Sequence, residues 1–236
     1  MTMRYKDCLR AIALCSFVFQ LGCSAVAYRL ASQPSLSKTR VFSGNKIYSL
    51  GDLLNSIALG DFEFDTYLFN TKTLRGYDTS LVVPIPTKQE NSEIGSIGRK
   101  PFIINLRIRT KTEDATILPF LSELYLRRDE VAIRPSEVYT GTRNGDCGSS
   151  AILAKTVIHG SPVPILNKRN IIDAEGNEID DWSILHWTCL QLRFDVETPD
   201  PSKSFRLKLG DISAPEGDHI RPMIYFSPVT YKMFLH

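Results

Sequence analysis

The stretch Phe102–Arg109 (FIINLRIR) decides the fold class, because its residue types alternate with a period of two. In an extended chain, one face would be wholly apolar and the other mixed: Phe102, Ile104, Leu106 and Ile108 against Ile103, Asn105, Arg107 and Arg109. This pattern is typical of a strand with one buried face. A polar second face also favours antiparallel over parallel sheets.

Six further segments show alternation or a composition rich in strand-forming residues: Asp61–Phe69, Ser80–Ile85, Leu190–Val196, Phe205–Leu209, Pro222–Phe226 and Tyr231–Leu235. We expect Leu190–Val196 and Phe205–Leu209 to form a two-strand meander across the turn-forming connector Thr198–Ser202. Many short strands separated by Pro, Gly, Asp and Asn indicate a β-sandwich or a small barrel. We therefore predict a mainly β fold, an antiparallel β-sandwich that is immunoglobulin-like or related.

One segment departs from the period of two. In Ser49–Leu59 (SLGDLLNSIAL), four apolar residues fall at helical spacing, and Ser49 with Asp52 fits an N-terminal cap. We expect one short helix here, on the N-terminal side of the strands.

The overall composition is that of an ordinary globular protein. Of 236 residues, 43% are hydrophobic and 23% are charged, which is too apolar for intrinsic disorder. Against 26 acidic residues stand 28 Lys and Arg, a net charge of +2. Such a balance gives no electrostatic reason to expect nucleic acid as a partner.

The N-terminus has the pattern of an export signal. Arg4, Lys6 and Arg10 precede the uncharged apolar run Ala11–Phe19, and small residues follow. The run is shorter than the roughly 20 apolar residues that a membrane-spanning helix needs. A basic start, a short apolar run and small residues together predict a secretory signal peptide.

Two cleavage sites compete. The run Gln20–Ser24 (QLGCS) resembles the lipobox of bacterial lipoproteins, in which a small residue precedes the cysteine that becomes lipidated, although Gln20 stands where Leu is usual. That resemblance implies a lipid on Cys23, and Ser24 after it implies the outer membrane. The alternative is ordinary cleavage after Ala27, at the A-x-A sequence Ala25–Ala27, giving a secreted or periplasmic protein.

These assignments divide the chain. Residues 1–22 are the predicted signal peptide, residues 23–44 a flexible tether rich in polar residues, and residues 45–236 the β-sandwich. The polar loop Glu90–Arg99 is where we would divide that domain in two. Residues 1–22 hold three basic residues and one acid, so the mature chain has 25 of each and no net charge.

After removal of residues 1–22, Cys147 and Cys189 are the two cysteines left inside the folded part. In an oxidising compartment we expect them to form one disulfide. The run Asn144–Ser150 (NGDCGSS) also resembles the signature of papain-like cysteine proteases, but Ser150 stands at the nucleophile's place and too little chain follows for the partner His. We therefore interpret the run as a Gly-rich turn that carries Cys147.

The sequence holds no strong catalytic or metal-binding motif. The four histidines stand far apart and form none of the usual zinc-binding patterns. The acidic stretch Asp173–Asp181 fits a hairpin tip better than a calcium loop. We therefore predict no catalytic residue, no metal and no cofactor, and favour a non-enzymatic role.

The favoured function is that of an exported lipoprotein with a structural or protein-interaction role. We expect it to be anchored in the outer membrane, facing the periplasm, with a further envelope protein as its partner. One alternative is an envelope hydrolase with a dispersed site around His186, His219 and Asp181. Another is a carbohydrate- or ligand-binding module, with Trp182, Trp187 and His186 as contacts.

Overall fold

The computed structural model describes residues 25–37, 47–49, 56–78, 85–86, 93–127, 131–144, 155–167, 171–172, 178–179, 186–214 and 219–235. These residues form a mainly β structure, with one 3₁₀ turn, η2 (Pro119–Leu121), and no α-helix among them. No helix in this part of the chain is long and apolar enough to cross a membrane. The predicted signal peptide and Cys23 lie outside the described residues.

The larger of the two main sheets is centred on the N- and C-terminal strands of the described chain. Its order is β10 (Glu123–Tyr125), β17 (Phe205–Lys208), β20 (Met223–Leu235), β1 (Ala25–Ser35), β5 (Asn70–Asp78) and β6 (Ile85–Pro86). In addition, β2 (Ile47–Ser49) pairs with β20, and β7 (Glu93–Gly95) pairs with β5. All pairings between these strands are antiparallel except that of β2 with β20.

The second main sheet contains the alternating stretch Phe102–Arg109. Its order is β12 (Lys155–Thr156), β11 (Glu137–Asn144), β16 (His186–Phe194), β8 (Phe102–Thr110), β4 (Phe62–Leu68) and β3 (Ser56–Leu59). A small sheet joins β13 (Val163–Pro164), β9 (Thr116–Leu118), β18 (Asp211–Ser213) and β19 (His219–Ile220). The hairpin of β14 (Ile171–Ile172) and β15 (Glu178–Ile179) confirms the hairpin expected around Asp173–Asp181.

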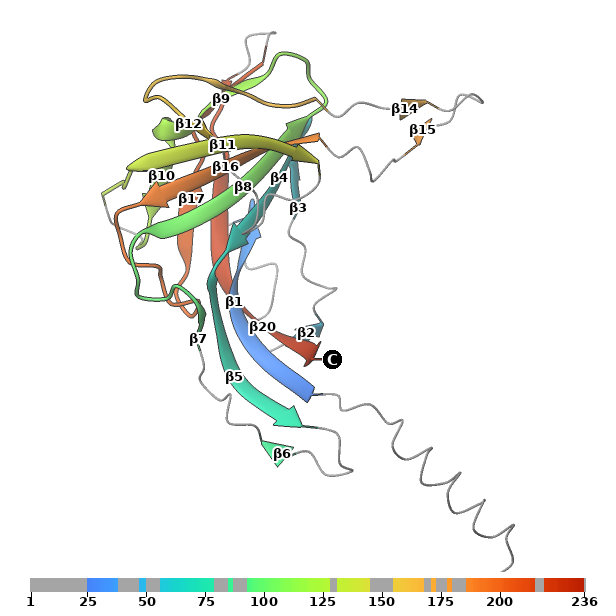
Figure 1. Cartoon of the computed structure of the whole chain (residues 1–236), viewed down its shortest axis with the longest axis vertical. Coiled ribbons are helices and arrows are strands. Elements are labelled where there is room, and N and C mark those ends of the chain that lie inside the picture. Colours follow the sequence, from blue (N-terminus) through green and yellow to red (C-terminus); the bar gives the residue numbers. More distant parts are fainter. Residues whose placement is uncertain are drawn as a thin grey trace, which may run out of the picture.

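Both main sheets and the small sheet contribute to one apolar core. The apolar face predicted for β8 is confirmed, since Phe102, Ile104, Leu106 and Ile108 have no exposed surface. From the opposite sheet, Phe205 of β17 meets Phe102 edge to face, with ring centroids 5.6 Å apart. Figure 1 shows β8, β11 and β16 in the upper part of the molecule, which holds this core.

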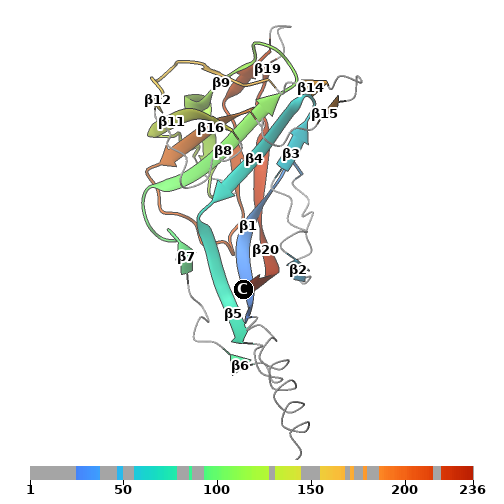
Figure 2. The ribbon, with the colours of Figure 1, turned by 45° about the vertical axis from the view of Figure 1, so that its right-hand side comes forward.

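Below the core, β1, β5 and β20 continue as a narrow ribbon (Figures 1 and 2). A second, smaller apolar cluster is centred there on Val229 and Tyr231 of β20, with Ala31 and Met233 against it. In this ribbon β1 is a central strand: Ala25–Ser35 pairs along its whole length with β20, and Ala25–Leu30 also pairs with β5.

The flexible tether expected over residues 23–44 is therefore wrong for Ala25–Ser35, which forms β1. Polar and small side chains concealed this strand, because a strand paired on both edges is held by its backbone hydrogen bonds. Ala27 and Pro34 are buried all the same. The remainder of the expected tether lies outside the described residues.

The helix expected over Ser49–Leu59 is not found. Ser56–Leu59 forms β3 and pairs with β4 in a hairpin, while residues 50–55 lie outside the described residues. Gly60 opens the two-residue turn with φ +58°, as a type II′ turn requires. In this hairpin Ile57 is buried and Ala58 is exposed. Burial therefore changes from one residue to the next, as in a strand, and does not follow the helical spacing.

Three finer expectations also need correction. The strands β16 and β17 do not form a meander: β16 lies in one main sheet and β17 in the other, so the connector between them crosses between the sheets. The two C-terminal strands are one strand, β20, which continues through Pro228. Part of the expected loop Glu90–Arg99 is strand β7, and the core contains side chains from both sides of that loop.

Candidate functional site

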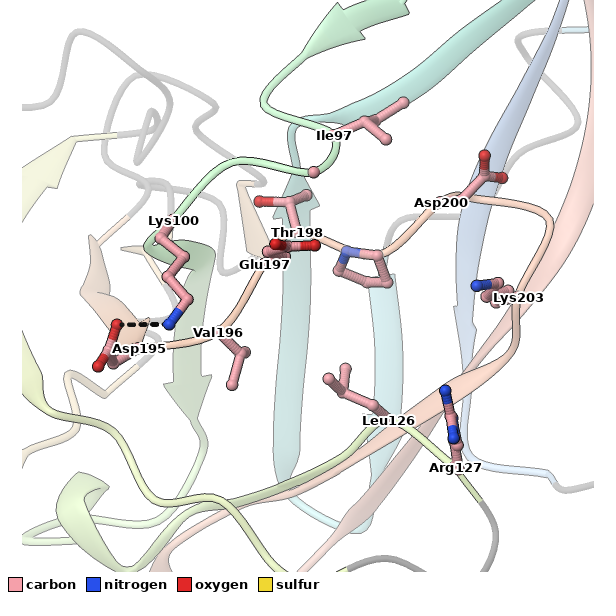
Figure 3. Close-up of a pocket in the computed structure, with 12 residues that line it drawn as sticks. Ile97, Lys100, Leu126, Arg127, Asp195, Val196, Glu197, Thr198, Asp200 and Lys203 are labelled. Carbon is pink, nitrogen blue, oxygen red and sulfur yellow. Dashed lines mark ion pairs between the residues drawn. The ribbon is translucent and has the colours of Figure 1, made fainter.

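The crossing connector forms one wall of a cavity of about 500 Å³. The cavity lies where three segments meet: the loop between β7 and β8, the end of β10, and the connector between β16 and β17 (Figure 3). Its lining residues are Ile97, Gly98, Lys100, Leu126, Arg127, Asp195, Val196, Glu197, Thr198, Pro199, Asp200 and Lys203. The volume falls within the range of roughly 300–1,000 Å³ that is usual for small-molecule sites.

Hydrogen bonds hold the wall in place. Thr198 is buried; its backbone N–H donates to the Arg99 carbonyl oxygen at 2.9 Å, and its own carbonyl oxygen accepts from Gly98 N–H at 2.9 Å. The Thr198 hydroxyl also donates to the Arg99 carbonyl at 3.2 Å. Farther along, the side-chain amide of Asn70 donates to the Pro199 carbonyl at 3.3 Å. A wall fixed in this way keeps the cavity formed without a ligand.

Three of the charged side chains that line the cavity belong to ion pairs. Lys100 Nζ lies 3.3 Å from Asp195 Oδ1, and Asp200 Oδ2 lies 3.9 Å from Lys72 Nζ of β5. Hydrogen bonds from Ser202 lower the pKa of Asp200 below its ordinary value, and the positive charge of Lys72 adds to this effect. Asp200 is therefore a stable carboxylate at neutral pH.

Two other lining charges, Glu197 and Lys203, are exposed and form no ion pair within 4 Å among the described residues, although the positive charge of Lys203 also acts on the Asp200 carboxylate. Figure 3 shows Lys100, Asp195 and Glu197 on one side of the cavity and Lys203 and Arg127 on the other. Between them lie Val196 and Leu126, which are partly buried and pack against the main core. The cavity is thus apolar in its middle and charged, with both signs, at its sides.

The sequence did not point to this cavity. Sequence patterns predict a turn between neighbouring strands at the connector Thr198–Ser202, and no motif marks Glu197 or Lys203. The lining comes from three segments far apart in the chain, and their meeting depends on β16 and β17 belonging to different sheets. Only the density of Pro and charged residues around the connector was a signal, and such residues are usual in turns.

Trp187, predicted as a ligand contact, is buried in β16 with only 3% of its surface exposed. The guanidinium groups of Arg107 and Arg109 lie over its ring, 4.7 and 4.3 Å from the ring centroid. These Arg side chains in turn bind Asp65 and Glu63 of β4. The ring therefore has no exposed face for a sugar, and Trp182 lies outside the described residues.

The remaining predicted residues are not brought together among the described residues. His186 begins β16 and pairs through its backbone with Asn144, but its side chain lies outside the description, as do Asp181 and Cys147. Cys189 is buried on β16, and the other four cysteines of the chain lie outside the described residues. The Cys147–Cys189 pairing stays a prediction.

His219 has two polar neighbours, but they do not make a catalytic triad. Its Nδ1 atom lies 3.4 Å from Asp211 Oδ2 and 3.3 Å from the Ser213 hydroxyl oxygen. In a Ser-His-Asp site the acid and the nucleophile contact different ring nitrogens, because one nitrogen takes the proton of the nucleophile while the acid orients the ring through the other. Here both contact the same nitrogen. In the described part of the chain, no group of three or more His, Cys, Asp or Glu residues is placed to hold a metal ion.

Comparison with known proteins identified no related protein. We found no match to this chain among protein family models, curated proteins or solved structures.

Proposed function

We propose that the protein is an exported, lipid-anchored component of the bacterial cell envelope that acts by binding a partner through a β-sandwich domain. The single observation that carries the anchor is the position of β1, which begins at Ala25, two residues after Cys23. The cavity and its mixed charges support a binding role.

The position of β1 favours one of the two cleavage sites. Cleavage before Cys23 leaves the strand whole. Cleavage after Ala27 would remove Ala25–Ala27, which pair with Met233–Leu235 of β20 on one side and with Gly76–Asp78 of β5 on the other. It would also remove the buried side chains of Val26 and Ala27. A signal peptidase that cut there would weaken the folded domain, which supports lipidation at Cys23 with cleavage before it.

The β-sandwich is the arrangement that best explains the core. Two antiparallel sheets stabilise each other by burying one face each against a common core. Phe102 and Phe194 on one sheet and Phe205 and Phe226 on the other belong to a single apolar cluster. We propose the immunoglobulin-like or related class on this basis.

Binding is favoured over catalysis by how the polar groups are arranged. Charged side chains of both signs line the cavity, a setting suited to recognising a charged ligand. The hydrolase alternative gains no support from His219, because both of its polar neighbours contact Nδ1. The carbohydrate alternative gains none from Trp187, because that ring is buried.

Mass spectrometry of the mature protein, purified from membranes, tests the anchor. We expect the first residue to be an acylated Cys23 and the protein to sediment with the outer membrane. Cys23→Ala should abolish acylation, whereas Cys15→Ala, a change in the segment that is removed, should not. A mature chain that starts at Tyr28 and carries no lipid would overturn the proposal. The same spectrum, taken without reduction, tests the Cys147–Cys189 linkage.

A further inference from the structure

We infer that the cavity beside the connector between β16 and β17 binds a short peptide with free termini, its ammonium group near Glu197 and its carboxylate near Lys203. This inference deepens the binding role proposed above and rests on it, but it does not depend on the lipid anchor. It follows from the cavity's charges, its apolar middle and the fixed position of its wall.

The two charges without an ion-pair partner decide the class of ligand. Glu197 and Lys203 have opposite signs and lie on opposite sides of the cavity (Figure 3). A ligand that carried only negative charge, such as a phosphate, would be repelled by Glu197, Asp195 and Asp200. A purely cationic ligand would meet Lys100, Arg127 and Lys203 instead. A zwitterion satisfies both sides at once.

The middle of the cavity favours a peptide over other zwitterions. Leu126 and Val196 present aliphatic surface in the middle of the cavity, which suits an apolar side chain. No aromatic residue lines the cavity, so a sugar ring or a nucleobase would find no ring to stack on. A short peptide combines separated end charges with an apolar side chain between them.

The wall is built to offer this surface without rearrangement. Thr198 is fixed to the loop between β7 and β8 by its backbone and its hydroxyl, and Ser202 N–H donates to Asp200 Oδ1 at 2.8 Å. Lys203 N–H donates to the Asp200 carbonyl at 3.0 Å, which sets where the Lys203 side chain leaves the connector. A preformed site loses less conformational entropy on binding.

Isothermal titration calorimetry on the purified full-length mature protein, at low ionic strength, tests the inference with the tripeptide Ala-Leu-Ala as the probe. We expect saturable binding that weakens about fivefold when the probe is N-acetylated or C-amidated, the upper effect of one solvent-exposed ion pair. Glu197→Gln should weaken binding of the free peptide but not weaken further the binding of the N-acetylated form. Lys203→Gln should behave in the same way toward the C-amidated form.

The matched control is Lys111→Gln, an exposed lysine outside the cavity lining, which should bind like the unchanged protein. No measurable heat with the free peptide, or equal binding of free and blocked peptides, would overturn the inference. So would a Lys111→Gln loss as large as that of Lys203→Gln, which would mean general charge attraction. The two experiments are independent. Absence of peptide binding would not change the mass-spectrometric result on Cys23, and absence of a lipid would not change the outcome of this titration.

Discussion

At the scale of single residues, a buried carboxylate depends on one arginine. Asp65 has no exposed surface, and Arg107 binds its Oδ2 atom through Nε and a terminal nitrogen. Removing one partner of a buried pair leaves an uncompensated charge. We expect Arg107→Met to lower the free energy of unfolding by about 3 kcal/mol, as measured by urea denaturation.

The neighbouring pair supplies the control. Arg109 binds Glu63 in the same way on the same two strands, but the Glu63 side chain is 29% exposed. Water can solvate that carboxylate after Arg109→Met, so the loss should be about 1 kcal/mol. Equal losses for the two variants would contradict the argument from burial. Adding Asp65→Asn to Arg107→Met should restore part of the stability.

A second residue-scale prediction concerns pH. A hydrogen bond from the Tyr125 hydroxyl, at 2.7 Å, lowers the pKa of Glu123, and the charges of Lys208 and Arg221 lower it further. A carboxyl group whose pKa is lower in the folded than in the unfolded protein stabilises the fold at pH values above its unfolded pKa. This contribution is lost as the pH falls through the folded pKa. We expect Tyr125→Phe to flatten the fall in unfolding free energy between about pH 5 and pH 3.

Tyr139→Phe is the matched control for this pH prediction. Its hydroxyl donates to Glu137 at 3.1 Å across the same two-residue spacing, but this pair is exposed. The stability of Tyr139→Phe should follow the pH curve of the unchanged protein. A Tyr125→Phe curve parallel to that of the unchanged protein would show that the hydroxyl does not hold the Glu123 carboxylate.

At the scale of elements, the close approach of two strands requires a glycine. Gly210 stands between β17 and β18, and a Cβ atom there would lie 1.9 Å from the Leu118 carbonyl oxygen at the end of β9. Because that oxygen belongs to the backbone, it has no rotamer through which to move away. We expect Gly210→Ala to cost about 3 kcal/mol of unfolding free energy, measured by thermal or urea denaturation.

Gly60, in the turn between β3 and β4, is the comparison. A Cβ atom there would have no neighbour within 4 Å, so Gly60→Ala meets only the conformational cost of φ +58°. That cost is about 1 kcal/mol. If Gly60→Ala proved as damaging as Gly210→Ala, steric contact between β9 and the β17–β18 link would not be the cause.

The elements also show what sequence patterns can predict here. Alternation located β4, β8, β16 and β17 because one face of each strand packs in the core. Burial of one face makes every second residue of the strand apolar. It failed for β1, whose small and polar residues are held by pairing on both edges. It also placed two strands, Pro222–Phe226 and Tyr231–Leu235, where the structure has the single strand β20.

The cavity lay beyond prediction for a related reason. Alternation says which face of a strand is buried, but not which sheet the strand joins. The assignment of β16 and β17 to different sheets converts a supposed turn into the wall of the cavity. No local sequence pattern around Glu197 or Lys203 indicates that β16 and β17 belong to different sheets.

At the scale of the whole molecule, the ribbon below the core depends on the start of β1. Val26 is 7% exposed and Ala27 is fully buried there, and both pair with β20 and β5. We compare two chains exported behind the same foreign signal peptide, one beginning at Ser24 and the other at Tyr28. The shorter chain should lose about 2 kcal/mol of unfolding free energy, because it gives up the burial of Val26 and the backbone pairs of three residues.

A third chain, beginning at Ala25, tests whether length alone matters. It keeps the whole of β1, so its urea midpoint should match that of the chain beginning at Ser24. If the chain beginning at Tyr28 were as stable as both, the first three residues of β1 would contribute nothing to folding. The structural preference for cleavage before Cys23 would then disappear, and only the resemblance of Gln20–Ser24 to a lipobox would support the anchor. A clear loss of stability in the chain beginning at Tyr28 would instead show that the ribbon needs Ala25–Ala27. Cleavage before Cys23 would then be the cleavage that leaves the fold intact.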